Sequence, residues 1–422
     1  MELNEKKDKI QNDAVEKWIY SGKQGTIEAI TGIGKMFIFL KALMTMPRHQ
    51  LDTKHLFLAE TTTRDKDLQE QIIIFNSIYN VDILALYNLE FHCYQEVYKW
   101  RGFKFGLIGC DEVHDQLSPE YIKFHLNNKY DAIICLTALI VSTQTYNLKR
   151  DIPLRNYFDK DLVTKHDMIA KIAPICFKYT VNEGQLDNTS RKLNIYIIKN
   201  QLDDKNKNVI GGGKHQKFYQ TEASAYSYAT KLFNDARNLE QKVDEDFIKY
   251  EERRQLKIIQ ASNKRSKLLY DLLSKVCIAK VLLANIKTKS IIFGNSISSL
   301  KKITPHVVCS QNDEETNDLI LDRFNKDIIT TIGSFKMLKQ GKNLKGVDNC
   351  FITSYYSSEV DIIQRIGRLR QNGDKVGNVF IIVTEGTQEV VWINKMLQNL
   401  TDFDFIYCSN VTECIEKYKQ NN

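Results

Sequence analysis

Short runs of consecutive apolar residues recur along this chain, and segments with helical spacing separate them. The first four runs occupy residues 55–60, 81–87, 105–111 and 131–137. A strand that is apolar on both faces is typical of a parallel sheet covered by helices on both sides. We therefore predict that the first part of the chain folds as an α/β domain.

The same pattern returns in the second half of the chain, at residues 192–199, 289–295, 327–333, 349–355 and 378–384. At 422 residues the chain exceeds the size of one ordinary domain. We predict two α/β domains, the first spanning residues 1–165 and the second spanning residues 166–422.

Residues 203–268 differ from the rest because they are rich in Lys, Glu, Gln and Ala and have helical periodicity. We interpret them as a helical insertion in the second domain. The glycine triplet at 211–213 near the start of this segment follows no apolar strand and precedes no helix beginning with Lys-Ser or Lys-Thr. It is therefore interpreted as a flexible loop and not as a phosphate-binding loop.

The charge balance is mildly basic, with 59 Lys and Arg against 52 Asp and Glu. This excess fits a polyanionic partner and fits an ordinary basic enzyme equally well. The nine cysteines lack zinc-ligand spacing, so we expect them to be reduced and mostly buried. The charged N-terminus and the absence of a run long enough to span a bilayer favour a cytoplasmic protein with no membrane partner.

Residues 25–44 read as a strand, a glycine loop and a helix: GTIEAI, then TGIGKM, then the apolar FIFLKALM. In such an arrangement Gly32 and Gly34 allow backbone N–H groups to surround phosphates at a helix N-terminus, and Lys35 reaches the terminal phosphates. The alternative is a glycine turn that precedes a core helix.

Two adjacent acids end the apolar run FGLIGCDEVHDQ. They stand at the carboxyl edge of the predicted sheet, where ligands of parallel sheets bind. Asp111 is a candidate Mg²⁺ ligand, and Glu112 is a candidate for polarising an attacking water. The alternative is that both acids cap the next helix.

These two segments together resemble motif I (Ala29 to Lys35) and motif II (Asp111 to His114) of superfamily 2 helicases. The resemblance implies two RecA-like lobes, ATP and Mg²⁺ as cofactors, and nucleic acid as partner, with DNA expected rather than RNA. It also implies a set of nucleotide-binding residues in the glycine loop: Thr31, Gly32, Ile33, Gly34, Lys35 and Met36.

Three further segments of the first lobe resemble motifs of this family. Gln11 stands where the family reads adenine, although a polar position on an amphipathic helix explains it equally well. Thr137 and Ala138 resemble motif III. In this family motif III, together with the residue that corresponds to His114, couples the state of the bound ATP to the binding of nucleic acid. Thr61 and Thr62 resemble motif Ia, which holds a phosphodiester backbone.

The second lobe resembles the family at KSIIFGNSISSL (motif IV), around Gly341 (motif V) and at EVDIIQRIGRLRQ (motif VI). Motif VI would contribute Gln364, Arg365, Arg368 and Arg370. Arginines there neutralise charge that develops on the transferred phosphoryl group. The alternative is a solvated basic helix face.

Three positions depart from the family. Met36 replaces the Thr or Ser whose hydroxyl ligates Mg²⁺, and a thioether is a poor ligand for this hard cation. Gln371 stands at the usual arginine-finger position, with Arg370 one residue early, and Asn343 replaces an Asp found in many relatives. These changes favour a slow or degenerate ATPase, but the retained Lys35 and Glu112 favour an active one.

The expected function is that of an ATP-dependent helicase or translocase, of a compact phage type or a Swi/Snf-like type. A phage-encoded protein would work in the host cytoplasm. Two alternatives stay open: a duplex-DNA translocase that does not unwind, and a nucleic-acid-binding scaffold with a decayed ATPase. The insertion at 203–268 is a candidate arm that contacts duplex or docks a protein partner.

Overall fold

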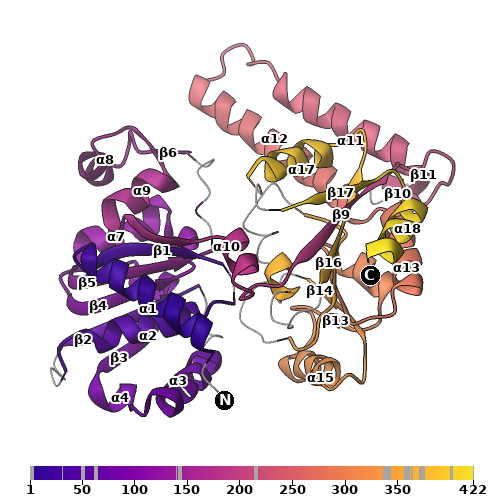
Figure 1. Ribbon diagram of the computed structural model, residues 1–422. Helices are drawn as coiled ribbons and strands as arrows, with labels where there is room; N and C mark the ends of the chain where they lie inside the picture. Colours follow the sequence, from indigo (N-terminus) through magenta and orange to yellow (C-terminus); the bar gives the residue numbers. More distant parts are fainter. Residues whose placement is uncertain are drawn as a thin grey trace. The chain divides into compact units, whose positions relative to one another are not determined.

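The chain divides into two compact units in the computed structural model, shown in Figure 1. The first unit comprises residues 1–191 with 362–374, and the second comprises 192–361 with 375–422. Each unit contains a parallel sheet flanked by helices, so the predicted α/β class with two RecA-like lobes is confirmed. The structure describes residues 4–30, 32–48, 53–60, 65–138, 140, 145–212, 217–335, 344–355, 362, 365–369, 376–399 and 403–421.

The sheet of the first unit has six parallel strands in the order β3-β2-β4-β5-β1-β8. Its strands are β1 (Gln24–Ala29), β2 (Lys54–Ala59), β3 (Asn88–Cys93), β4 (Lys104–Asp111), β5 (Lys129–Thr137) and β8 (Ile175–Tyr179). A small antiparallel pair joins β6 (Thr145–Asn147) and β7 (Leu162–Thr164). The helices are α1 (Glu5–Tyr20), α2 (Lys35–Met44), α3 (Asp65–Tyr79), α4 (Ile83–Leu86), α5 (Tyr94–Val97), α6 (Val113–Gln116), α7 (Pro119–Asn127), α8 (Ile152–Phe158), α9 (Lys165–Ile172), α10 (Val181–Leu186) and the 3-10 turn η2 (Gly367–Leu369).

The central strands of this sheet are buried because both of their faces are apolar. Leu56 of β2, Ile108 of β4 and Ile133 of β5 are all fully buried in one cluster. The indole of Trp18 on α1 donates a hydrogen bond of 2.8 Å to the carbonyl of Ile133, which ties α1 to the middle of β5. The strand ends that carry the predicted motifs are therefore held by a packed core.

One predicted strand of this unit is wrong. Within residues 81–87 the chain forms the short helix α4 (Ile83–Leu86), because the side chain of Asp82 accepts a hydrogen bond from the backbone N–H of Ala85 and caps a helical turn. The strand β3 begins only after it, at Asn88. Apolar content alone does not separate a short buried helix from a strand.

The boundary between the units also differs from the prediction. We expected the second domain to begin at residue 166, but residues 166–191 lie in the first unit. The reason is that β8 pairs with β1, with Ile27 opposite Phe177, and so extends the first sheet. This strand, ICFKY, is only five residues long and includes the charged Lys178, so it is shorter and less uniformly apolar than the runs recognised as strands.

The sheet of the second unit has seven parallel strands in the order β13-β14-β12-β15-β16-β9-β17. Its strands are β9 (Leu193–Asn200), β12 (Ser290–Phe293), β13 (Val307–Val308), β14 (Thr331–Ser334), β15 (Asn349–Ile352), β16 (Gly377–Thr384) and β17 (Phe405–Cys408). The helices that flank it are α13 (Leu273–Asn285), α14 (Ile297–Ile303), α15 (Glu314–Asn325), α17 (Gln388–Asn399) and α18 (Val411–Asn421). Strand β16 is buried at all of its positions, as expected for the middle of a doubly covered sheet.

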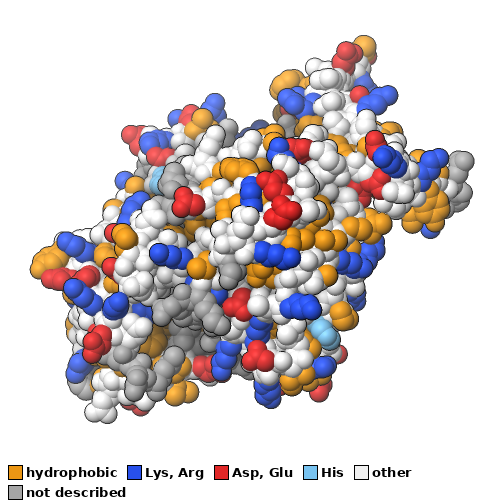
Figure 2. Space-filling model, turned by 45° about the vertical axis from the view of Figure 1, so that its right-hand side comes forward, with side chains coloured by type: hydrophobic (Ala, Val, Ile, Leu, Met, Phe, Trp, Pro, Cys, Tyr) orange, Lys and Arg blue, Asp and Glu red, His pale blue; other side chains and the backbone are white. Residues whose placement is uncertain are grey.

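Charged side chains of both signs are interspersed on the surface shown in Figure 2. Seven of the nine cysteines are buried, whereas Cys277 is exposed. Among the described residues, no helix combines the length and the apolar character that crossing a bilayer requires.

The insertion at 203–268 is helical only in part. It begins with an antiparallel hairpin of β10 (Val209–Gly212) and β11 (Lys217–Gln220), followed by α11 (Glu222–Arg237) and α12 (Phe247–Tyr270). Gly211 and Gly212 belong to β10, so the interpretation of the triplet as a flexible loop is wrong for these two residues; Gly213 lies outside the described residues.

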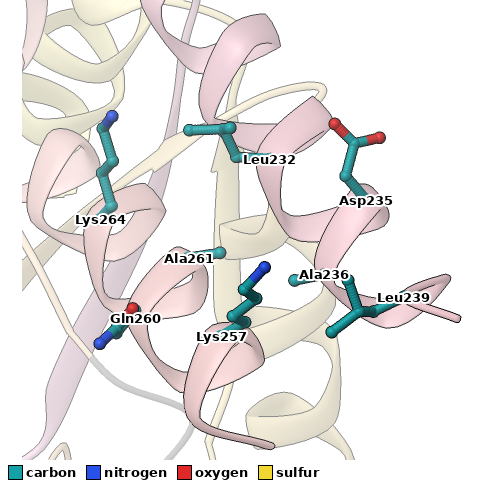
Figure 3. A pocket seen from close by; sticks show the side chains of 8 residues that line it. All are labelled: Leu232, Asp235, Ala236, Leu239, Lys257, Gln260, Ala261 and Lys264. Carbon is teal, nitrogen blue, oxygen red and sulfur yellow. The ribbon is translucent and has the colours of Figure 1, made fainter. Parts of the chain in front are cut away.

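The two long helices of the insertion pack side by side and extend away from the sheet of the second unit (Figure 1). The guanidinium of Arg265 on α12 lies 4.1 Å from the ring centre of Phe233 on α11. Beside this contact a groove of about 360 Å³ separates the helices (Figure 3). Its lining contains none of the predicted site residues and comprises Leu232, Asp235, Ala236, Leu239, Lys257, Gln260, Ala261 and Lys264.

Candidate active site

The glycine loop between β1 and α2 has the backbone that the sequence predicts. Gly32 and Gly34 both have left-handed backbones, with φ of +92° and +88°, which side chains rarely adopt. Gly34 is also the N-cap of α2, and Lys35 is the first residue of that helix. The loop therefore ends at a helix N-terminus, which favours bound anions. Thr31 lies outside the described residues.

The end of β4 places two carboxylates beside this loop. Asp111 is the last residue of β4, and the backbone N–H of Glu112 donates a hydrogen bond of 3.1 Å to its Oδ1 atom. Glu112 has a φ of +46°, a left-handed backbone that costs free energy for a residue with a side chain. The hydroxyl of the buried Tyr94 donates a hydrogen bond to the carbonyl of Asp111 and so stabilises this turn.

An ion pair joins the two motifs across 77 residues of sequence. The Nζ atom of Lys35 lies 3.0 Å from Oε1 of Glu112, and the two side chains are only 11% and 8% exposed. Low exposure strengthens the attraction between these charges and makes either one costly to leave unpaired. The structure thus brings together the cation and the carboxylate that sequence reasoning assigned separately.

Helix α1 supports the glycine loop from one side. The side chain of Gln11, which is 5% exposed, donates through Nε2 to the carbonyl of Ile33 at 2.8 Å. The ammonium of Lys7 donates to the carbonyl of Gly32 at 2.9 Å, and burial lowers the pKa of Lys7. Sequence reasoning missed Lys7, although its spacing of four residues from Gln11 places both on one helix face.

The predicted link between motifs II and III has a direct contact. Nδ1 of His114 lies 2.9 Å from the hydroxyl oxygen of Thr137, and both side chains are buried. The same nitrogen lies 3.5 Å from Oε2 of Glu112, and Ala138 follows at the end of β5. Lys165, which sequence reasoning also missed, donates from α9 to the carbonyl of His114 at 2.6 Å.

The remaining predicted residues fall into two groups. Met36 is described, and its side chain is 6% exposed in the core next to the loop. Arg365 is 1% exposed, but the side chain of Arg368 lies outside the description. The other predicted positions outside the described residues are Thr61, Thr62, Gly341, Gln364 and Arg370.

A comparison with protein-family models matches residues 265–373 to the helicase conserved C-terminal domain. Among solved structures, Dbp5 of S. cerevisiae bound to RNA and ADP BeF3 is 12% identical, with a TM-score of 0.54 over 98% of this chain and 93% of that one. Residues 265–373 thus match a helicase C-terminal domain, and the likeness to Dbp5 is one of fold. The ATP-dependent Type ISP restriction-modification enzyme LlaBIII bound to DNA is 13% identical, with a TM-score of 0.56.

This second likeness covers all of the present chain but only 32% of LlaBIII, so the chain spans about a third of that enzyme. At these identities both likenesses concern the fold. No curated protein sequence matches the chain. In the first unit, the ion pair of Lys35 and Glu112 brings the start of α2 next to the end of β4.

Proposed function

We propose that this protein is an ATP-driven motor that acts on nucleic acid, with ATP bound at the glycine loop of the first unit. The observation that carries the proposal is the buried ion pair between Lys35 and Glu112 beside the N-terminus of α2. A phosphate-binding lysine and a water-orienting carboxylate are the two groups that phosphoryl transfer needs from such a lobe.

The ion pair also provides a mechanism for sensing nucleotide. When the phosphates of ATP arrive, the ammonium of Lys35 exchanges the carboxylate of Glu112 for phosphate oxygens. Glu112 is then free to accept a hydrogen bond from the attacking water, while Arg365, Arg368 and Arg370 supply positive charge for the transferred group. The chain thus keeps Glu112 neutralised until substrate is present.

Magnesium would be held by Asp111. Its carboxylate oxygens are hard ligands that suit this cation, whereas the buried thioether of Met36 does not. The described residues contain no cluster of three or more metal-ligating side chains. Proteins usually bind Mg²⁺ through one or two carboxylates together with substrate phosphates and water. The cation would neutralise charge on the phosphates.

Coupling of hydrolysis to movement is assigned to the contact between His114 and Thr137. His114 is on α6, and its Nδ1 atom lies close to the carboxylate of Glu112. Thr137, which His114 also contacts, is the last residue of β5, the strand beside β4. A change at Glu112 therefore reaches the end of β5 through two side chains. Movement along a strand requires that contacts with nucleic acid differ between the nucleotide states.

The preferred polymer is proposed to be DNA. The two solved structures compared above are bound to different polymers, Dbp5 to RNA and LlaBIII to DNA. The assay of the proposal must therefore include both polymers as well as different strand arrangements.

The test is ATP hydrolysis measured with no polymer, single-stranded DNA, duplex DNA, forked DNA and RNA. We expect stimulation by one polymer. Glu112→Gln should retain nucleotide binding and lose about 100-fold or more in turnover, because the amide orients water without accepting its proton. Lys35→Ala should lose nucleotide binding itself. Turnover that survives Glu112→Gln would contradict the assignment of this site.

A second candidate function is a nucleic-acid-binding scaffold whose ATPase has decayed, and the observation that favours it is Met36 at the position of a magnesium ligand. Polymer binding without any turnover would support it. A third candidate, a duplex translocase that does not unwind, is separated by two assays. A pure translocase displaces a triplex strand but does not separate a duplex.

A further inference from the structure

The hairpin of β10 and β11 is exposed on both of its faces. Ile210 and Tyr219 face each other across the strands on one face and are 61% and 64% exposed. Phe218 is 52% exposed, and its ring lies across Gly211, where an added Cβ would stand 2.8 Å from the ring. Within the described residues, neither strand pairs with any strand other than its partner in the hairpin.

Such a ribbon buries little apolar surface of its own. A two-stranded hairpin is marginally stable in water, and three exposed large apolar side chains on four-residue strands add a further cost. No described side chain of this hairpin belongs to the buried cluster around Tyr196 or to the one around Tyr226. Flat, exposed rings of this kind suit a ligand that stacks on them.

The charge of the segment restricts that ligand. Lys205, Lys207 and Lys217 are exposed, and the sequence from 205 to 221 contains no Asp or Glu. No ion pair within the described residues engages Lys207 or Lys217. Exposed aromatic rings combined with lysines and no acids match a single nucleic-acid strand, because unpaired bases stack on rings while phosphates contact the cations.

We propose that the hairpin of β10 and β11 is a binding site for single-stranded nucleic acid, with a base stacked on Tyr219 and the backbone held by Lys207 and Lys217. Phe218 offers a second ring on the opposite face. The inference rests on the proposed function, which supplies nucleic acid as the class of partner. It goes beyond that function by placing a contact with a nucleic-acid strand in the insertion. Duplex is not expected to use this site, since its bases are already stacked.

The test measures binding of labelled single-stranded DNA and RNA, and of a blunt duplex, to the full chain without nucleotide. Tyr219→Val keeps a residue that favours strands but removes the ring. It should weaken single-strand binding about tenfold and duplex binding less than twofold. Tyr219→Phe should bind as the parent does. Lys217→Gln should lower the slope of log affinity against log salt by about 0.7.

The matched control is Tyr407→Val, because Tyr407 is a 56% exposed tyrosine on strand β17 of the same unit. It should leave both affinities unchanged. Tyr219→Val with parental single-strand binding, or with equal loss of duplex binding, would overturn the inference. Tyr219→Val that alters self-association by ultracentrifugation, with parental binding of nucleic acid, would indicate strand pairing with a second chain instead. No binding of any polymer by the parent would refute the proposed function itself.

Discussion

Glu112 and Met36 are the two residues of the candidate site whose individual properties bear most on its chemistry. Glu112 occupies a left-handed backbone and a buried position at once, and Lys35 lies 3.0 Å away to neutralise it. Strain and burial at a single carboxylate are both costly, and such costs concentrate at functional sites. Met36 is the one described residue of the loop whose chemistry opposes the proposed function.

Replacing Met36 by Thr should restore a hydroxyl ligand for Mg²⁺. We expect the concentration of Mg²⁺ that gives half-maximal ATP turnover to fall several-fold, because an oxygen replaces a soft sulfur beside the phosphates. The measurement is a magnesium titration of ATP hydrolysis. Met36→Val, which has nearly the same shape as Thr but no hydroxyl, is the control. Equal behaviour of both variants would show that position 36 does not contact the cation.

His125 should make stability depend on pH. Burial lowers the pKa of His125 to about 3, whereas an unfolded histidine titrates near 6.5. Between these values the unfolded chain binds a proton that the folded chain does not. The free energy of unfolding should therefore fall as pH decreases from about 6.5 to 3.

Urea unfolding at several pH values measures this effect. His125→Gln should show a shallower decline below pH 6.5, although it is less stable at neutral pH. The exposed His166 provides the control, because His166→Gln should leave the decline unchanged. If the free energy of unfolding of the parent and of His125→Gln fell in parallel as pH decreased, His125 would not be the group responsible.

Secondary-structure elements of the second unit are joined by a buried ion pair. Lys275 of α13 and Glu389 of α17 are 3% and 0% exposed, and burial lowers the pKa of Lys275. Glu389 also accepts a hydrogen bond of 3.0 Å from the backbone N–H of Thr384 at the end of β16. The carboxylate of Glu389 therefore connects two helices and the end of a strand. Loss of Lys275 should consequently lower the stability of the second unit more than loss of a surface lysine would.

Lys275→Met should destabilise the second unit by roughly 3–5 kcal/mol, because it leaves the charge of Glu389 buried without its cation. The double variant with Glu389→Gln should recover much of the loss. Unfolding can be followed through Trp392 on α17, the tryptophan of the second unit. A single variant as stable as the parent would contradict the role of this ion pair in holding the helices together.

The whole molecule carries a net charge of +7, and on the face shown in Figure 2 charged side chains of both signs are interspersed. Contact with a nucleic-acid backbone would then depend on lysines and arginines at particular sites. Neutralising even a few phosphates makes affinity fall steeply with salt.

Binding of duplex or single-stranded DNA should therefore weaken at least about tenfold between 50 and 200 mM salt. Titrations of labelled DNA at four or five salt concentrations measure the slope directly. The same titrations with a neutral fluorescent dextran give the background. An affinity that does not change with salt would argue against every version of the motor.

The sequence by itself determined the two-lobed α/β fold, the strands that run into the candidate site, and the identity of the glycine loop and the paired acids. These features are local, because apolar runs, glycines at a helix start and acids at a strand end act over a few residues. The sequence did not determine that Ile83–Leu86 forms a helix, that β8 extends the first sheet, or that the insertion begins with an exposed hairpin.

Only the tertiary structure decided which distant residues meet. The contacts of Lys35 with Glu112, of Lys7 with Gly32 and of Lys165 with His114 join elements that lie far apart in the chain. Such contacts depend on the order in which strands pair and on how helices pack over them. That order follows from burial summed over the whole lobe, which no short stretch of sequence encodes.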